Sequence, residues 1–294
     1  MSEPMRDVII IGGGPAGLTA GLYAARAGLN ALLLERLMAG GQVALTSRVE
    51  NYPGFPEGVD GPDLCMKMEE QAVRAGLELR YEGALEIDCA AKRVRADEGW
   101  LEAKHLILAL GAQARKLNVP GEEKLTGRGV GYCATCDGAL YRDGRVAVVG
   151  GGNAAVEEAL YLAGIAKEVT LIHRRDTLRA EQALVNRALE HPRITILWNS
   201  EVERLEGEAK LTAIVLKDGR ELPMDGLFVA IGRVPQTELV KGQLSLNEQG
   251  FILADESCKT SLPGVFVAGD ARAKALRQVV TAVADGAVAA AGCE

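Results

Sequence analysis

Short apolar runs that end at a glycine or an acid recur along this chain. Residues 7–12 read Asp-Val-Ile-Ile-Ile-Gly, and a β-branched run of this length predicts a buried parallel strand. The alanine-rich segment from Ala16 to Ala27 predicts a helix, and Ala31–Leu34 predicts a second strand that Glu35 closes. This order predicts a β-α-β unit with glycines at its first turn.

The same pattern occurs a second time, 138 residues farther along the chain. Residues 145–150 predict a strand, 153–163 a helix and 168–172 a second strand. Two such units in one chain of 294 residues predict an α/β protein with two Rossmann-like domains, each a three-layer structure around a parallel sheet.

Glycines at the first turn of each unit predict a dinucleotide site. Glycine lets the backbone approach a pyrophosphate, which rests on the N-terminus of the following helix. In the first unit, Glu35 is placed to accept hydrogen bonds from ribose hydroxyls. The residues expected to bind here are Gly12, Gly14, Pro15, Ala16, Gly17 and Glu35.

The second unit differs from the first at the position of the acid. The shift of 138 residues carries Glu35 to His173, which begins the run His173-Arg174-Arg175, and Arg179 follows. Guanidinium groups bind a 2′-phosphate that a carboxylate would repel, although a solvated basic face is the alternative interpretation. FAD in the first site and NADPH in the second is the simplest assignment. The expected NADPH residues are Gly150, Gly152, Asn153, Ala154, His173, Arg174, Arg175, Arg179 and Gly232.

Between the two glycine motifs lies Cys133-Ala-Thr-Cys136, a pair that can store two electrons as a disulfide. A structural zinc site would need a second pair of ligands, and the three histidines offer none at a suitable spacing, so we expect no metal site. The other alternative is a pair of buried free thiols. We expect the remaining cysteines to be small hydrophobic residues: Cys65, Cys89, Cys258 and Cys293.

Composition excludes several other classes of protein. A net charge of −7 gives a nucleic-acid role no electrostatic support. No apolar run reaches the ~18–20 residues of a membrane span. The first seven residues lack a signal-peptide pattern, so we expect a cytoplasmic protein.

Several motifs together resemble the low-molecular-weight bacterial thioredoxin reductases over essentially the whole chain. The redox box is Cys133-Ala-Thr-Cys-Asp-Gly138, and the NADPH elements are GGGNAAVEEALYL from Gly150 and HRRDTLR from His173. The flavin segments are Gly40-Gly41-Gln42, Val49–Gly54, Gly264–Asp270 and Arg277-Gln278.

The resemblance implies the remaining site residues and an electron path. It implies flavin contacts from Gly41, Gln42, Asn51, Gly269, Asp270, Arg277 and Gln278. It also favours Asp137 as a proton-handling group beside the catalytic Cys133 and Cys136, whereas position alone equally allows a helix cap. Electrons would pass from NADPH through FAD to the disulfide and on to thioredoxin or a thioredoxin-like protein. A homodimer is implied as well.

The linkers predict that one domain is inserted in the other. Residues 1–118 plus 244–294 are expected to form the FAD domain, and residues 119–243 the NADPH domain that carries the cysteine pair. The resemblance implies rotation of the inserted domain, and we expect hinges near Val119–Gly121 and around Lys241–Leu244.

Other functions stay open at this point. The acceptor could be a peroxiredoxin, a glutaredoxin-like protein or a small disulfide. A flavoprotein that senses nucleotides without turnover is an alternative of a different class.

Overall fold

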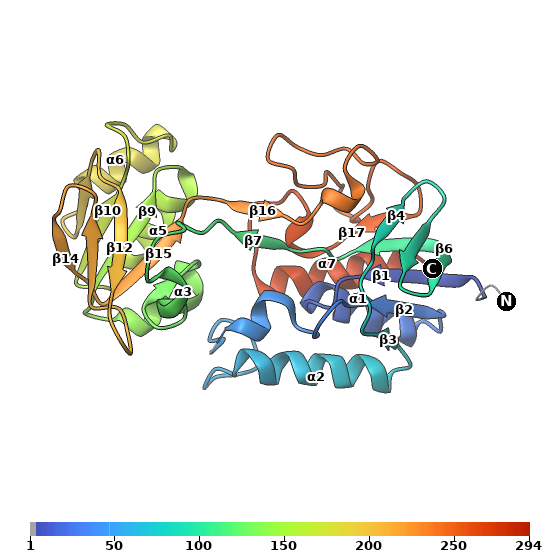
Figure 1. The fold of residues 1–294 in the computed structure, drawn as a ribbon. Coiled ribbons are helices and arrows are strands. Elements are labelled where there is room, and N and C mark those ends of the chain that lie inside the picture. The colour runs from blue at the N-terminus through green and yellow to red at the C-terminus, as the bar shows by residue number, and fades with distance from the viewer. Residues whose placement is uncertain (1–3, 47) are drawn as a thin grey trace. The chain divides into compact units, whose positions relative to one another are not determined.

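The computed structural model describes residues 4–46 and 48–294. The described chain forms two compact units (Figure 1). Unit 2 is the continuous segment Ala114–Arg233, and unit 1 consists of the described residues up to Gln113 and from Val234 onward. The two ends of the chain therefore build one unit together, and its middle builds the other.

Unit 1 is organised around a seven-stranded sheet in the order β3-β2-β1-β6-β5-β4, with β17 also paired to β6. Strand β1 lies between β2 and β6 and is parallel to both, while β4 and β5 extend the sheet as an antiparallel hairpin. The strands are β1 (Arg6–Ile11), β2 (Ala31–Leu34), β3 (Glu78–Arg80), β4 (Glu86–Asp88), β5 (Arg93–Ala96), β6 (Gly99–Leu108) and β17 (Val265–Val267).

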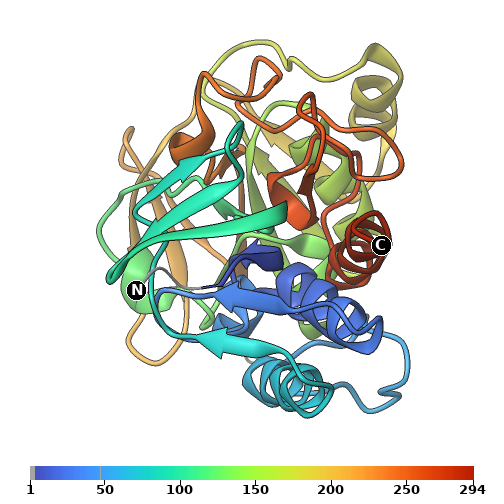
Figure 2. The ribbon, with the colours of Figure 1, turned by 90° about the vertical axis from the view of Figure 1, so that its right-hand side faces the viewer.

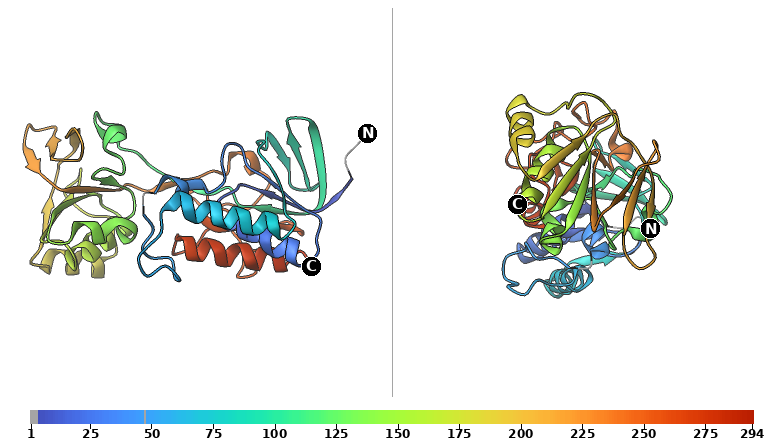
Figure 3. Two further views of the ribbon diagram at one scale, coloured as in Figure 1. Left: turned by 90° about the horizontal axis from the view of Figure 1, so that it is seen from below. Right: turned by 90° about the vertical axis from the view of Figure 1, so that its left-hand side faces the viewer.

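Three helices pack side by side in unit 1: α1 (Pro15–Arg26), α2 (Gly61–Arg74) and α7 (Val279–Ala291) (Figures 2 and 3, left). Alternation along β1 explains the two cores of this unit, because Val8 and Ile10 join the cluster with the helices while Ile9 and Ile11 join the cluster on the other face. All four side chains have 4% exposure or less, so a strand buried on both faces reads as a continuous apolar run.

Unit 2 has three layers around a parallel sheet of order β11-β10-β9-β15-β8 (Figure 3, right). One face packs against helices and the other against an antiparallel sheet, β12-β13-β14. The helices on the first face are α4 (Ala134–Asp137), α5 (Asn153–Ala163) and α6 (Gln182–Glu190), whereas α3 (Glu122–Leu125) packs on the side of the antiparallel sheet. The strands are β8 (Val130–Gly131), β9 (Arg145–Gly150), β10 (Glu168–Ile172), β11 (Ile194–Leu197), β12 (Val202–Glu206), β13 (Ala213–Leu216), β14 (Glu221–Pro223) and β15 (Gly226–Ala230).

The fold confirms the predicted α/β class with two Rossmann-like units. Strands β2, β9 and β10 and helix α5 have the predicted bounds, and β1 and α1 differ from prediction by one residue at each end. The antiparallel strands were not predicted, because they are short, most are partly polar, and none carries a glycine motif to mark it.

The chain passes between the units through β7 (Ala112–Ala114) and β16 (Arg233–Pro235), which pair in a two-stranded sheet. The expected hinge at Val119–Gly121 lies inside unit 2, where the Pro120 carbonyl accepts a hydrogen bond from Leu205. The expected hinge near Lys241–Leu244 lies inside unit 1, where the Gln243 side chain donates to the Ile87 carbonyl. Both expected hinges are thus held within a unit, and the sequence boundaries at 118 and 244 lie beyond the observed divisions at 113 and 234.

Short 3₁₀ segments complete the fold: η1 (Gly41–Leu45), η2 (Gly138–Tyr141), η3 (Glu238–Val240) and η4 (Gly269–Ala271). Within the described residues, no helix combines the length and the apolar character needed to cross a membrane.

Candidate functional site

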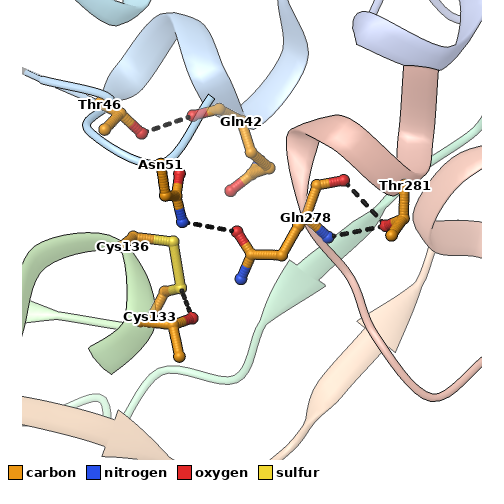
Figure 4. The surroundings of a disulfide bond; sticks show 8 residues. Gln42, Thr46, Asn51, Cys133, Cys136, Gln278 and Thr281 are labelled. Carbon is orange, nitrogen blue, oxygen red and sulfur yellow. Dashed lines mark hydrogen bonds between the residues drawn. A yellow bond between two sulfur atoms is a disulfide. The ribbon is translucent and has the colours of Figure 1, made fainter. Parts of the chain in front are cut away.

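The cysteine pair of unit 2 is joined as a disulfide, with Cα atoms 5.3 Å apart (Figure 4). Cys133 is the N-cap of α4, and Cys136 lies on that helix. The Cys133 sulfur lies 3.4 Å from the Thr135 hydroxyl. One turn of chain therefore holds both sulfurs at bonding distance, as the spacing predicts.

The other four cysteines are buried free thiols, as expected of small hydrophobic residues. Burial raises the pKa of Cys65, Cys89 and Cys258 to about 11 and that of Cys293 to about 12. Because the thiolate is the reactive form, these four side chains are inert near neutral pH.

The glycine turn of unit 1 is shaped by close backbone contacts. Gly12 has φ +106°, and a Cβ there would lie 2.4 Å from the Ala109 carbonyl oxygen. A Cβ on Gly17 would lie 1.9 Å from the Gly12 oxygen, whereas a Cβ on Gly14 would meet no atom within 4 Å. Gly14 thus borders open space at the N-terminus of α1, which no side chain caps, and the backbone N–H groups there can donate hydrogen bonds to a phosphate.

Two further predicted segments reach the same turn. The Gly40 amide donates to the Gly13 carbonyl at 2.7 Å, and a Cβ on Gly41 would lie 3.3 Å from the Gly14 Cα. From the other end of the chain, a Cβ on Gly269 would lie 2.9 Å from the Cβ of Ala16. The fold therefore brings three glycine-containing segments to the start of α1.

Glu35 lies at the end of β2 and faces this turn, as predicted. Its Oε2 accepts the Gly13 amide at 2.7 Å, and its Oε1 accepts the Leu37 amide at 3.1 Å. An ionised carboxylate offers about four acceptor positions, so capacity is left for ribose hydroxyls.

Asn51 and Gln278 are 227 residues apart in the chain, yet the Asn51 amide donates to Gln278 Oε1 at 3.1 Å (Figure 4). Gln278 also caps α7 through a reciprocal capping box with Thr281. In the segment before it, Nε of Arg277 donates to the Asp270 carbonyl at 3.3 Å. These contacts place four of the predicted flavin residues in one connected group. Gln42 lies in η1, where its carbonyl accepts the Thr46 hydroxyl (Figure 4).

Sequence reasoning missed Asp285, an acid with 8% exposure within the alanine-rich helix α7. Its carboxylate accepts the Gly269 amide at 3.0 Å, an Arg272 guanidinium N–H at 2.9 Å and the Lys274 ammonium at 2.8 Å. Asp285 thereby holds the loop on both sides of Asp270. The available signal was an isolated acid in an apolar helix, since a buried carboxylate requires such partners.

The glycine turn of unit 2 repeats the geometry of unit 1. A Cβ on Gly150 would lie 2.4 Å from the Ala230 carbonyl oxygen, and one on Gly152 would meet no atom within 4 Å. In unit 1 the side chain of Glu35 packs over Gly13. In unit 2 the ring of His173 packs over Gly151 in the same way, and a Cβ on Gly151 would lie 2.1 Å from the His173 Cε1.

The basic residues of this turn divide into two kinds. His173 has 5% exposure, and its Nε2 lies 2.9 Å from the Thr177 carbonyl oxygen, so it packs the loop against the turn. Arg174, Arg175 and Arg179 are exposed, and the Arg179 amide donates to the Gly151 carbonyl at 2.7 Å. The guanidinium groups are therefore the exposed cations beside the glycine turn.

The other predicted residues of unit 2 lie near the same strand ends. Asn153 exchanges two hydrogen bonds with Glu181, and Ala154 beside it is exposed. Gly232 has φ +108°, and its carbonyl accepts the Arg115 amide at 3.0 Å.

Asp137 is the last residue of α4, next to Cys136, and precedes η2. Burial is the main cause that raises the pKa of Tyr141, and the nearby charge of Asp137 raises this pKa further. The carboxyl therefore lies in the same helical turn as the disulfide.

The two turns differ in the charge that they offer to a nucleotide. The turn of unit 1 presents a carboxylate, which suits a ribose with a free 2′-hydroxyl, and that of unit 2 presents guanidinium groups, which suit a 2′-phosphate. The disulfide belongs to the unit with the basic turn.

Comparisons with known proteins agree with this chemistry. Residues 6–286 match the family model described as pyridine nucleotide-disulphide oxidoreductase. The chain is 47% identical to the thioredoxin reductase of Mycolicibacterium smegmatis, over 100% of this chain and 97% of the relative. The thioredoxin reductase structure from Streptococcus pyogenes MGAS5005 shares 43% identity with a TM-score of 0.93, covering 99% of this chain and 98% of that one. The structure from Giardia duodenalis shares 38% identity with the same TM-score and the same coverage.

Proposed function

The chain belongs to the pyridine nucleotide-disulphide oxidoreductases, in the thioredoxin reductase group, and we propose that it passes electrons from NADPH to the disulfide of a thioredoxin. As a member of this group it is an NADPH-dependent oxidoreductase that uses FAD. The observation that carries the proposal is the Cys133–Cys136 disulfide, placed in the same compact unit as the arginine-bearing glycine turn.

We assign FAD to unit 1 and NADPH to unit 2. The open turn at Gly14, the carboxylate of Glu35 and the connected group around Asn51 and Gln278 support the first assignment. The exposed Arg174 and Arg175 support the second. Since the nicotinamide and the disulfide both belong to unit 2, each must meet the flavin in turn, and β7 and β16 are the strands through which such a movement would act.

Bound FAD would supply the step that converts a hydride into an electron pair for a disulfide. Reduction of Cys133–Cys136 takes two electrons and two protons and yields two thiols. One thiolate then attacks the partner disulfide to form a mixed disulfide, and the second thiolate resolves it, which is why a pair is required. Asp137, next to Cys136, is positioned to exchange a proton as the thiolates form.

A direct assay tests this proposal. The purified protein should be yellow, and NADPH should bleach it. Thiol release from a small aromatic disulfide should be slow alone and fast when thioredoxin is added. Equal rates with and without thioredoxin would assign the protein another acceptor, and a flavin that NADPH does not bleach would favour a sensor.

Replacing Arg174 and Arg175 with glutamate should weaken the binding of NADPH more than the binding of NADH. A charge-assisted hydrogen bond contributes ~1.5–3 kcal/mol, so the KM for NADPH should rise by roughly 10- to 100-fold while that for NADH changes little. Steady-state kinetics with both nucleotides measure this. Arg187→Glu, an exposed arginine on α6, is the matched control and should leave both values unchanged. An equal loss for the two nucleotides would contradict the 2′-phosphate assignment.

We also propose a cytoplasmic homodimer. The similarity to thioredoxin reductases supports the dimer, and the four reduced buried cysteines suit a reducing compartment. Sedimentation equilibrium of the FAD-loaded protein and fractionation of its host cells test the two statements.

A further inference from the structure

Glu158 is a half-buried acid that directly contacts the redox loop. It lies on α5, which packs against α4. Its carboxylate accepts a hydrogen bond from the backbone N–H of Ala134, the residue between Cys133 and the rest of the redox box. The residue as a whole is only half-buried, but its Oε2 is buried and has no hydrogen-bond partner among the described residues.

The surroundings of Glu158 make its charge costly. Burial raises the pKa of its carboxyl to about 7, and the charge of Glu157 adds to this. The Ala134 N–H and the charge of Arg233 act in the opposite direction and only partly compensate. The packed helix α4 itself carries Asp137. Glu158 therefore changes charge near neutral pH, and it is hydrogen-bonded to Ala134, the residue that follows Cys133.

We propose that Glu158 is a positioning residue that couples its own protonation to the reduction of the Cys133–Cys136 disulfide. When reduction leaves a thiolate in this loop, Glu158 takes up a proton, and the loss of its negative charge stabilises the thiolate. The inference deepens the proposed dithiol chemistry, yet it can be tested without NADPH or thioredoxin.

The step balances in protons and electrons. Two electrons break the S–S bond and leave two sulfur anions. One sulfur takes a proton and becomes a thiol, and the second proton goes to Glu158, so the other sulfur stays a thiolate. When the thiolate attacks a partner disulfide and the Cys133–Cys136 bond forms again, both protons are released. Like charges at short range disfavour each other, which is why the proton on Glu158 favours the thiolate.

The pH dependence of alkylation tests this coupling in the FAD-loaded protein. After anaerobic reduction with dithiothreitol, iodoacetamide labels thiolates, and peptide mass spectrometry measures labelling of Cys133 and Cys136. The other cysteines do not compete, because the pKa of each is about 11 or 12. Glu158→Gln keeps an oxygen for the Ala134 N–H and removes the charge.

At pH values above the pKa of Glu158, wild-type Glu158 is ionised and raises the pKa of the neighbouring thiol. E158Q should therefore label about threefold to tenfold faster there, because one unit of thiol pKa is a tenfold change in thiolate. Below about pH 6, where Glu158 is neutral in both proteins, the ratio should fall to about one. Glu190→Gln, an exposed acid at the end of α6 in the same unit, is the control and should keep the wild-type profile.

Coincident profiles of E158Q and wild type, or an equal change in E190Q, would overturn the inference. A second measurement needs no variant. During reduction of the wild type by dithiothreitol, an indicator dye counts released protons, ultraviolet absorbance counts thiolates and visible absorbance corrects for flavin reduction. Fewer protons than thiolates supports uptake by Glu158, and equal numbers refute it.

Discussion

Cys136→Ser should abolish thioredoxin reduction while NADPH still bleaches the flavin. The serine cannot form the Cys133–Cys136 disulfide that the structure shows, so no electron pair can leave the flavin by this route. Loss of a nucleophile that acts through a covalent intermediate costs roughly 10³-fold or more in rate. Anaerobic stopped-flow absorbance measures the bleaching, and a coupled assay measures thioredoxin turnover.

The control for this variant is Cys293→Ala, which removes a buried thiol outside the redox loop. It should lower the thermal stability slightly, because a buried sulfur is lost, and leave thioredoxin turnover unchanged. Retained thioredoxin reduction in Cys136→Ser would show that the pair is not the electron carrier.

Gly17→Ala should yield a protein that binds no FAD. The new Cβ would lie 1.9 Å from the Gly12 oxygen, a backbone atom that cannot move without opening the β1–α1 turn. Overpacking of a well-packed site costs typically ~1–3 kcal/mol and occasionally more. The expected result is a colourless and less stable protein, measured by flavin absorbance and by thermal unfolding.

Gly14→Ala separates the packing of the turn from the binding of the cofactor. Its Cβ would meet no atom within 4 Å, so the apoprotein should unfold at the wild-type temperature. FAD affinity should nevertheless fall, because the methyl group fills the space beside the free amides of α1. Unchanged FAD titration of this variant would mean that the pyrophosphate does not lie at this turn.

Most of the secondary structure near the glycine turns could be predicted because its signals are local. Strands β2, β9 and β10 have the predicted bounds, and each is a short apolar run ended by a polar residue or a glycine. The sequence alone also placed Glu35 and His173 at equivalent positions, and both side chains indeed pack over a glycine of their turn.

Both segments where hinges are expected lie inside a compact unit, and local sequence does not reveal this. The segment before Gly121 is fixed by Glu122, a side chain with 3% exposure whose carboxylate accepts the amides of Leu117 and Asn118. No local pattern reveals that a residue farther along the chain will bind these amides. The chain crosses between the units at β7 and β16, and Pro235 in β16 does not by itself distinguish this strand from other segments that contain proline.

The sequence by itself determined the two nucleotide turns, the exchange of an acid for basic residues between them, and the cysteine pair. All three depend on residues that are close together in the chain, where backbone geometry leaves few choices. Only the tertiary structure decided that Asp285 binds the Gly269 amide, that Asn51 donates to Gln278 and that Glu158 accepts the Ala134 amide. Burial, charge and hydrogen bonding of these side chains depend on contacts between distant segments, and those contacts exist only once the chain has folded.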